Sequence, residues 1–273
     1  MSFLRKLTQS LSGGEGWRPA GKSGARAYAI GDIHGRLDLL DMLLDKIEAD
    51  IASRRPKRNF IIFLGDLVDR GPDSAGVVER LRTFRPSWAK PIFLAGNHEE
   101  VLLRMIAGEK KILPSWLKYG GIQCAQSYGL DPEAMRMLDE EAALQLVAAK
   151  VPRAHAEFLE SFGDTFRFGD YLFVHAGIRP GIALEEQDRT DLRWIREPFL
   201  SDAKQHGLMV VHGHTIVDRV EERPNRIAID TGAYHSGVLT VLAVEDRERW
   251  FLSAEGSRPG LSGGYERPAP AAA

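Results

Sequence analysis

The sequence contains only one cysteine, Cys124, among its 273 residues. A single cysteine cannot form a disulfide within the chain, and this scarcity is typical of proteins in a reducing compartment. We expect Cys124 to fill apolar space rather than to act as a nucleophile. No apolar run approaches the roughly 18 residues that a membrane-spanning helix needs. The first residues also lack the apolar block of a secretory signal, so we expect a cytoplasmic protein that does not bind a membrane.

The sequence also lacks an excess of either charge. Its 36 basic and 38 acidic residues give a formal net charge of −2. Proteins that bind nucleic acids without sequence preference rely on a surplus of lysine and arginine. We therefore expect no stable nucleic-acid partner, although a balanced total leaves room for a local basic pocket.

Glycine, serine and proline are concentrated near the two ends of the chain. Residues 12–25 have the composition of a linker, so we predict a flexible leader over residues 1–25. The segment from 253 to 273 has the same character and is predicted to be disordered. The folded domain is expected between residues 26 and 252.

Strand and helix patterns alternate in the first part of this domain. Short apolar runs predict strands, and apolar residues at a helical period predict helices between them. The strands are expected at 27–30, 60–64 and 92–94, and the helices at 37–51, 77–84 and 99–106. This alternation predicts a parallel sheet with crossover helices.

The second part of the domain has a different pattern. Residues 113–162 are predicted to form a helical cap insert. Strand patterns then dominate, at 165–168, 171–174, 208–211, 226–229, 238–244 and 250–252. An α/β first half and a strand-rich second half predict two sheets packed face to face, with helices outside.

Polar residues follow five of the expected strands directly. These residues are Asp32 and His34, then Asp66, Asp69 and Arg70, then Asn97 and His98, then His175, and finally His212 and His214. In open α/β sheets, ligands bind beyond the carboxyl ends of the strands. Imidazole and carboxylate groups together suit zinc, iron and manganese, and an aspartate between two ions can bridge them. The pattern predicts a two-metal site of the kind that acts on phosphorus.

The segments GDIHG, GDLVDRG, GNHE, VHAG and GHT occur in that order between residues 26 and 245. They resemble the motifs of the calcineurin-like metallophosphoesterases, above all the bacterial and phage relatives of the PPP-type serine/threonine phosphatases. The resemblance implies a four-layer αββα sandwich with two mixed sheets. It also implies two divalent transition-metal ions, with manganese the first expectation in vitro and iron or zinc as alternatives.

The resemblance also implies a role for each matching residue. The metal ligands would be Asp32 and His34 for the first ion, Asp66 as the bridge, and Asn97, His175 and His214 for the second ion. The catalytic residues would be His98 as the general acid, Asp69 to orient it, and Arg70 and Arg196 to bind the phosphate. Arg196 is proposed because WIREPFL is similar to a phage-type segment that supplies a second arginine.

Three further residues stay open at this stage. His212 precedes His214 in VHGHT, and it either contacts metal or packs in the interior. Tyr234 and His235 lie in IDTGAYHSG, which resembles a segment lining the site of the family, and packing would explain them equally well.

The expected reaction is hydrolysis of phosphomonoesters by a hydroxide that bridges two metals. The first hypothesis for the substrate is a phosphoserine or phosphothreonine protein, or a small phosphorylated molecule. The alternative is a symmetrical bis(5'-nucleosyl)-tetraphosphatase. That group tends to carry alanine, aspartate and tryptophan where this chain has Asp69, Glu99 and Thr215, although VHAGI at 174–178 resembles it. A binding module without activity would have lost metal ligands, and all six are present.

Overall fold

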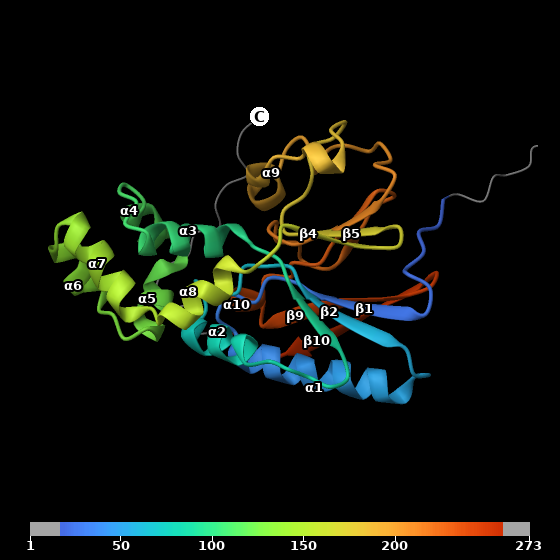
Figure 1. Ribbon diagram of the computed structural model, residues 1–273, viewed down its shortest axis with the longest axis horizontal. Coiled ribbons are helices and arrows are strands. Elements are labelled where there is room, and N and C mark those ends of the chain that lie inside the picture. Colours follow the sequence, from blue (N-terminus) through green and yellow to red (C-terminus); the bar gives the residue numbers. More distant parts are fainter. Residues whose placement is uncertain (1–16, 259–273) are drawn as a thin grey trace, which may run out of the picture.

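The computed structural model describes residues 17–258, which form two five-stranded sheets with helices around them (Figure 1). The parts of the predicted leader and tail at 1–16 and 259–273 lie outside the described residues. From top to bottom in Figure 1, a helix, the second sheet, the first sheet and a long helix follow one another. The predicted α/β sandwich of two mixed sheets is confirmed.

The first sheet has the strand order β10-β9-β1-β2-β3. Its strands are β1 (Ala25–Ile30), β2 (Arg58–Phe63), β3 (Lys90–Phe93), β9 (Val238–Glu245) and β10 (Glu248–Glu255). β1, β2 and β3 are parallel, whereas β9 pairs antiparallel with both β1 and β10. Helices α1 (Leu37–Ser53) and α2 (Ser74–Arg82) bury apolar side chains against its outer face, because those side chains recur at the helical period.

The second sheet has the strand order β4-β5-β6-β8-β7. Its strands are β4 (Thr165–Phe168), β5 (Tyr171–Val174), β6 (Met209–His212), β7 (Glu221–Glu222) and β8 (Arg226–Ala228). Phe60 and Ile62 of the first sheet pack against Phe173 and Val211 of the second in the core between the layers. The outer face packs against the segment that contains α9 (Arg189–Trp194).

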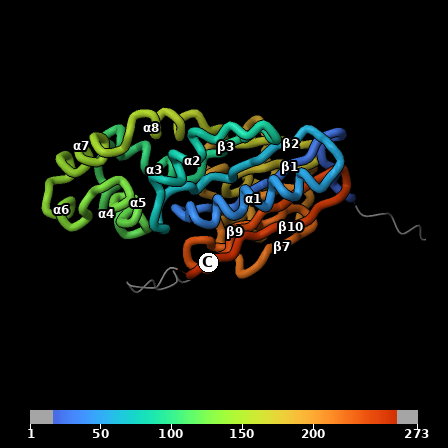
Figure 2. Tube along the Cα trace, turned by 90° about the horizontal axis from the view of Figure 1, so that it is seen from below, coloured from blue at the N-terminus to red at the C-terminus, as the bar shows by residue number. Residues whose placement is uncertain are grey.

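A group of short helices forms the insert at one end of the sheets (Figures 1 and 2). After α3 (Asn97–Ile106) come α4 (Leu113–Trp116), a distorted turn at Leu117–Gly121, α5 (Ile122–Ser127), α6 (Pro132–Met137), α7 (Glu140–Lys150) and α8 (Arg153–Glu160). Residues 132–150 form two helices instead of one because Asp139 begins α7, where its side chain accepts a hydrogen bond from the Ala142 amide.

The ends of the folded region differ from the prediction. β1 begins at Ala25, and β10 continues to Glu255 instead of ending at 252. Residues before β1 are also held, since the Gly21 amide donates to the Asp246 carbonyl at 2.6 Å and the Ala20 amide to the Asp170 carboxylate at 2.9 Å. A composition rich in glycine and proline gives no sign of such contacts with distant turns. Four short elements, η2 (Leu184–Glu186), β7, α9 and α10 (Ala233–Ser236), were not predicted either.

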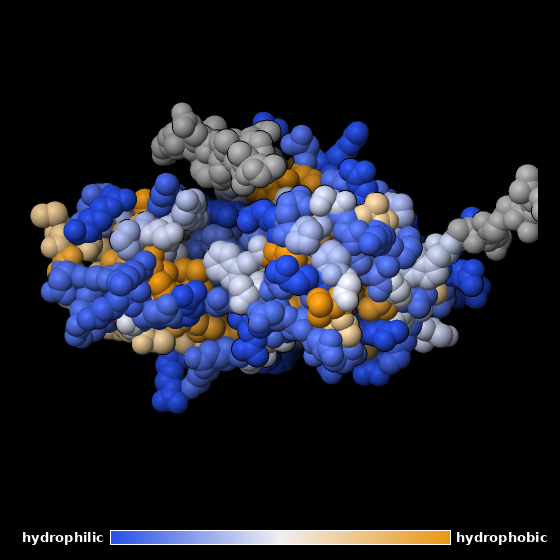
Figure 3. Space-filling view, turned by 90° about the horizontal axis from the view of Figure 1, so that it is seen from above, coloured by the Kyte–Doolittle hydropathy of each residue, from blue (hydrophilic) through white to orange (hydrophobic). Residues whose placement is uncertain are grey.

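Figure 3 shows a face that is mainly hydrophilic, with hydrophobic side chains in separate patches. Among the described helices, none combines the length and the apolar character needed to cross a membrane.

Candidate metal centre

The predicted site residues meet where strands of both sheets end. The loops after β1 and β2 and the start of α3 come from the first sheet, and the loops after β5 and β6 come from the second. All six predicted ligands are at most 6% exposed: Asp32, His34, Asp66, Asn97, His175 and His214. The convergence of these segments, which are distant in the sequence, follows from the parallel strands of the two facing sheets.

Several of these residues have a left-handed backbone. Five of the seven non-glycine residues with positive φ in the described chain belong to the predicted site: His34, Asp66, Asp69, Arg70 and His214. Such conformations cost about 1 to 3 kcal/mol each and are found where function requires them. Backbone hydrogen bonds between the first two loops hold this arrangement, because the His34 amide donates to the Asp66 carbonyl at 2.8 Å.

Glu99 organises the loop after β2. Its buried carboxylate accepts hydrogen bonds from the amides of Asp66 (2.8 Å), Leu67 (2.7 Å) and Gly96 (2.9 Å). Burial, followed by the nearby charge of Asp66, raises the pKa of Glu99 to about 7, although the amide hydrogen bonds oppose this rise. In the sequence, Glu99 served only to distinguish this chain from the symmetrical tetraphosphatases. The structure shows that Glu99 holds the amide of Asp66 in place.

The Asp66 carboxylate lies at the centre of the site. Its Oδ1 is 3.4 Å from Nε2 of His175, and its Oδ2 is 3.4 Å from Nε2 of His34 and 3.9 Å from Nε2 of His98. Two groups of possible ligands share it, namely His34, Asp66 and His98, and Asp66, His175 and His214. Two buried groups with one common aspartate fit a dinuclear centre, and the position of Asp66 suits a bridge.

The histidines are oriented by groups outside the centre. Nδ1 of His34 lies 2.7 Å from the Val68 carbonyl, and Nδ1 of His175 lies 2.9 Å from the Leu64 carbonyl. A carbonyl can only accept, so Nδ1 carries the proton and Nε2 presents a lone pair to a metal ion. Burial also lowers the pKa of both rings, which favours the neutral form that binds metal.

Asn97 lies beside the second group of ligands. Its side-chain oxygen is 3.1 Å from Nε2 of His175 and 2.9 Å from Nδ1 of His214. An amide oxygen is neutral, so this half of the centre has little negative charge apart from Asp66.

Several polar atoms of the centre have no hydrogen-bond partner among the described residues. They are Oδ1 of Asp32, Nε2 of His214 and Oδ2 of Asp230, all of them buried. An unsatisfied buried polar group costs about 1 to 3 kcal/mol. Burial and the charges of Asp230 and Asp66 also raise the pKa of Asp32. Divalent cations would remove this cost, so the residues present fit the metal ions that the sequence predicts.

His98 forms a close pair with Asp69. Nδ1 of His98 is 2.6 Å from Oδ2 of Asp69, and Oδ1 of Asp69 accepts a hydrogen bond of 2.9 Å from the indole of Trp116. Although burial lowers the pKa of His98, Asp66 and Asp69 raise it above its ordinary value overall. The predicted pairing of His98 with Asp69 is present, and Trp116 of the insert secures it. From the sequence alone, Trp116 was expected only as a residue of the helical insert.

The two predicted arginines lie at the edge of the centre. Nη1 of Arg70 is 3.0 Å from Nε2 of His34, and its guanidinium lies over the Tyr234 ring at 5.1 Å. The Arg70 amide donates to the carbonyl of Gly120 in the insert at 2.8 Å. Arg196 is exposed, and burial of part of its side chain and the charge of Arg70 lower its pKa, whereas Asp66 raises it. Both guanidinium groups are therefore close enough to interact electrostatically with the carboxylates of the site.

The three residues left open by the sequence have different positions. Nδ1 of His212 faces the Gly213 carbonyl at 3.0 Å, its Nε2 lies 3.4 Å from Nη1 of Arg226, and its ring packs against Phe199. The Tyr234 ring contacts His34 edge to face at 5.5 Å, so it lines the site. His235 is exposed and contacts Tyr234. His212 is thus a packing residue in this structure.

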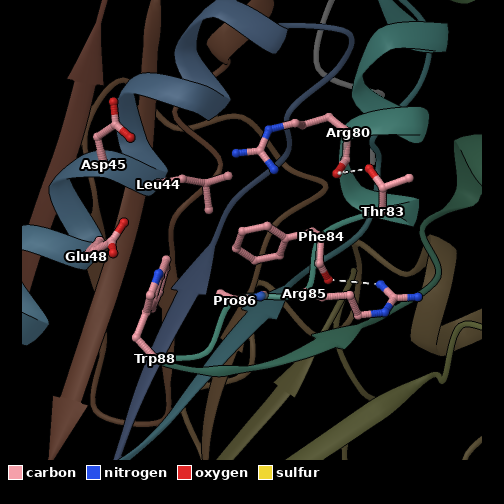
Figure 4. A pocket seen from close by; sticks show the side chains of 9 residues that line it. All are labelled: Leu44, Asp45, Glu48, Arg80, Thr83, Phe84, Arg85, Pro86 and Trp88. Carbon is pink, nitrogen blue, oxygen red and sulfur yellow. Dashed lines mark hydrogen bonds between the residues drawn. The ribbon is translucent and has the colours of Figure 1, made fainter.

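A separate hollow lies towards the other end of the strands of the first sheet. It has a volume of about 270 Å³ and is bordered by α1 and by the segment from α2 to β3, where Leu44 and Phe84 face each other (Figure 4). Trp88, which borders it, precedes β3, whereas the metal centre follows the strands. The hollow therefore shares no residue with the centre.

Comparison with known proteins agrees with this geometry. The sequence matches the family Calcineurin-like phosphoesterase over residues 25–241. It is 28% identical over 231 residues to serine/threonine-protein phosphatase 1 of Salmonella typhimurium, covering 82% of this chain and 94% of that protein. It is 26% identical over 265 residues to a symmetrical bis(5'-nucleosyl)-tetraphosphatase of Dechloromonas aromatica, covering 81% and 93%.

A solved structure supports the fold. The crystal structure of a putative diadenosine tetraphosphatase superposes with a TM-score of 0.61 at 19% identity, covering 87% of this chain and all of that one. The family match spans most of the chain, and the buried histidine and aspartate groups supply a metal centre. This chain is therefore a metal-dependent phosphoesterase that belongs to the calcineurin-like family.

Proposed function

We propose that this protein hydrolyses phosphomonoesters and that its substrates are phosphoserine and phosphothreonine in proteins. The observation that carries this proposal is the buried pair of His98 and Asp69, which are 2.6 Å apart. A serine or threonine alkoxide is a poor leaving group and needs a proton as the ester bond breaks. Symmetrical cleavage of a dinucleoside tetraphosphate instead releases a diphosphate oxygen, which leaves more easily. A well-held general acid therefore suits the protein substrate better.

Each residue of the site would have its own role in the hydrolysis. When bound, two divalent ions supply an activated water and neutralise charge on the phosphoryl group, and we propose manganese for assays in vitro. Arg70 binds two phosphoryl oxygens through its planar guanidinium, and Arg196 approaches from the opposite loop. Nε2 of His98 gives a proton to the leaving oxygen, while Asp69 orients the ring and stabilises its charged form.

The second candidate is a symmetrical bis(5'-nucleosyl)-tetraphosphatase. A specific observation favours it: Tyr119 of the insert is 55% exposed and lies next to Gly120, whose carbonyl binds the Arg70 amide. Tyr119 could stack on a nucleobase, and Lys118 beside it could bind a further phosphate. Lys118 and Tyr119 lie in a short mixed stretch of the sequence that has no clear basic cluster, so we place this candidate second.

A direct comparison of substrates tests the proposal. With equal Mn²⁺, we expect kcat/KM for a phosphoserine or phosphothreonine peptide to exceed that for diadenosine tetraphosphate. Chromatography of the nucleotide products shows in parallel whether the dinucleotide is cleaved to ADP alone. A preference of about tenfold or more for the dinucleotide, with ADP as the sole product, would replace the first proposal by the second.

A further inference from the structure

Asp230 is an acidic residue at the metal centre that the sequence did not identify. It follows β8 and is 1% exposed. Its backbone carbonyl accepts a hydrogen bond from the Val217 amide at 2.9 Å, which connects it to the loop after β6. The chain before it is pressed against Gly31, because a Cβ atom at Gly31 would lie 2.5 Å from the Ile229 carbonyl oxygen. Asp230 is thereby placed next to the loop that holds Asp32.

Asp230 has the same arrangement of hydrogen bonds as two predicted metal ligands. In each case a backbone amide holds one carboxylate oxygen: that of His214 for Asp32 (3.0 Å), that of His98 for Asp66 (3.1 Å), and that of Gly232 for Asp230 (2.9 Å). The other oxygen of both Asp32 and Asp230 is buried with no donor among residues 17–258. In each of these two carboxylates a backbone amide holds one oxygen, and the other oxygen has no donor in the described chain. Such a carboxylate is arranged to bind a cation through its second oxygen.

The charges around Asp230 also favour a cation beside it. After burial, Asp230 is the largest electrostatic influence on Asp32, and Asp66 acts on both carboxylates. Arg70 is the cationic side chain that most favours ionised Asp230, and it also serves Asp32. Two adjacent buried carboxylates repel each other unless a proton or a positive charge lies between them.

We propose that Asp230 provides an additional carboxylate for the ion at the Asp32 and His34 end of the centre. This inference rests on the metal-dependent chemistry proposed above. It gives the two halves of the centre different character: one has Asp32 and Asp230 besides the shared Asp66, and the other has the neutral Asn97, His175 and His214. The first half should therefore bind a divalent ion more tightly than the second.

Metal titration of the Asp230→Asn variant tests the proposal. Asparagine has nearly the same shape, and its oxygen still accepts the hydrogen bond from Gly232. The variant therefore keeps this anchor but loses the negative charge and the oxygen that would face the ion. We expect Mn²⁺ titrated into the metal-free, full-length protein to bind one site at least about 10- to 100-fold more weakly, the loss known for residues that only support a metal ligand, and the other site almost unchanged. Asp45→Asn, on the exposed surface of α1, is the matched control and should bind both ions like the wild type.

Thermal unfolding separates a role in metal binding from a purely structural one. Without metal, Asp230→Asn should melt at the same temperature as the wild type or higher, because it removes repulsion with Asp32. With Mn²⁺, its stabilisation should be smaller than that of the wild type. Unchanged Mn²⁺ affinity at both sites would overturn the proposal. A lower melting temperature without metal, together with equal weakening at both sites, would also overturn it. Failure of the wild type to bind Mn²⁺ would instead refute the metal centre on which both proposals depend.

Discussion

Replacing His98 by asparagine should slow the enzyme by an amount that depends on the leaving group. The imidazole is held at 2.6 Å by Asp69, and Asp69 is fixed in turn by Trp116. Asparagine can fill part of the same space but cannot donate a proton as an acid. The loss should therefore be large for an alkyl phosphate and small for p-nitrophenyl phosphate, whose leaving group needs little protonation.

The size of the effect follows from the environment of the ring. General acid catalysis contributes about 10² to 10⁴-fold, which corresponds to about 2.7 to 5.5 kcal/mol of barrier. His98 is buried, and its pKa is raised by Asp66 and Asp69 against the effect of burial. This direction of the pKa shift favours the protonated form that a general acid needs, so we expect a loss within that range for a phosphoserine peptide. For p-nitrophenyl phosphate we expect a loss of less than about tenfold.

The assay compares kcat for the two substrates under conditions in which chemistry limits the rate. Metal content is measured in the same samples, because His98 also lies within reach of Asp66. His155→Asn is a suitable control: His155 is a buried histidine of the insert whose ring also contacts a carboxylate, that of Glu79 at 3.1 Å. Equal losses on both substrates, or loss of metal from His98→Asn, would show that His98 is not the general acid.

Three further predictions concern the same centre. Asp66→Asn should lower turnover by several orders of magnitude and reduce bound metal, which elemental analysis measures; an active wild type with under half an equivalent of transition metal would contradict the dinuclear centre. Trp116→Phe should reduce kcat for alkyl phosphates by about 3- to 30-fold, since it removes one hydrogen bond to Asp69, and should leave p-nitrophenyl phosphate nearly unaffected. The pKa of His98 is raised and its protonated form is the active one, so the rate with alkyl phosphates should fall as pH rises through a value above about 6.5; a pH–rate profile of His98→Asn that keeps this alkaline fall would exclude the assignment.

The sequence allowed the fold and most of the centre to be predicted, for a physical reason. Apolar strands that end in glycine and then aspartate, asparagine or histidine leave a local signal, and parallel strands bring such ends together. Residues whose role depends on contacts between distant segments leave no such signal. Trp116 reads as a core residue of a helix, and Asp230 as a turn residue. The charged side chain of Glu99 gave no indication that it holds the amides of another loop.

The bounds of the first and last strands were predicted less well for the same reason. The Gly21 amide is bonded to the turn between β9 and β10, and the Ala20 amide to the turn between β4 and β5. Local composition describes how flexible a segment is when it is alone. It does not include the partners that the fold provides.

The contacts of the insert with Asp69 and Arg70 limit how this enzyme can evolve. Trp116 and Gly120, four positions apart, bind two consecutive residues of the site through the Asp69 carboxylate and the Arg70 amide. Gly120 has φ of +116°, and a side chain there would collide with Arg70, so few substitutions are open to it. Mutations that adapt this surface to a new substrate therefore also disturb the general acid and the phosphate clamp. Selection for specificity and selection for turnover act here on the same short segment, and exchanging it between relatives should succeed only when its Trp116 and Gly120 equivalents are transferred with it.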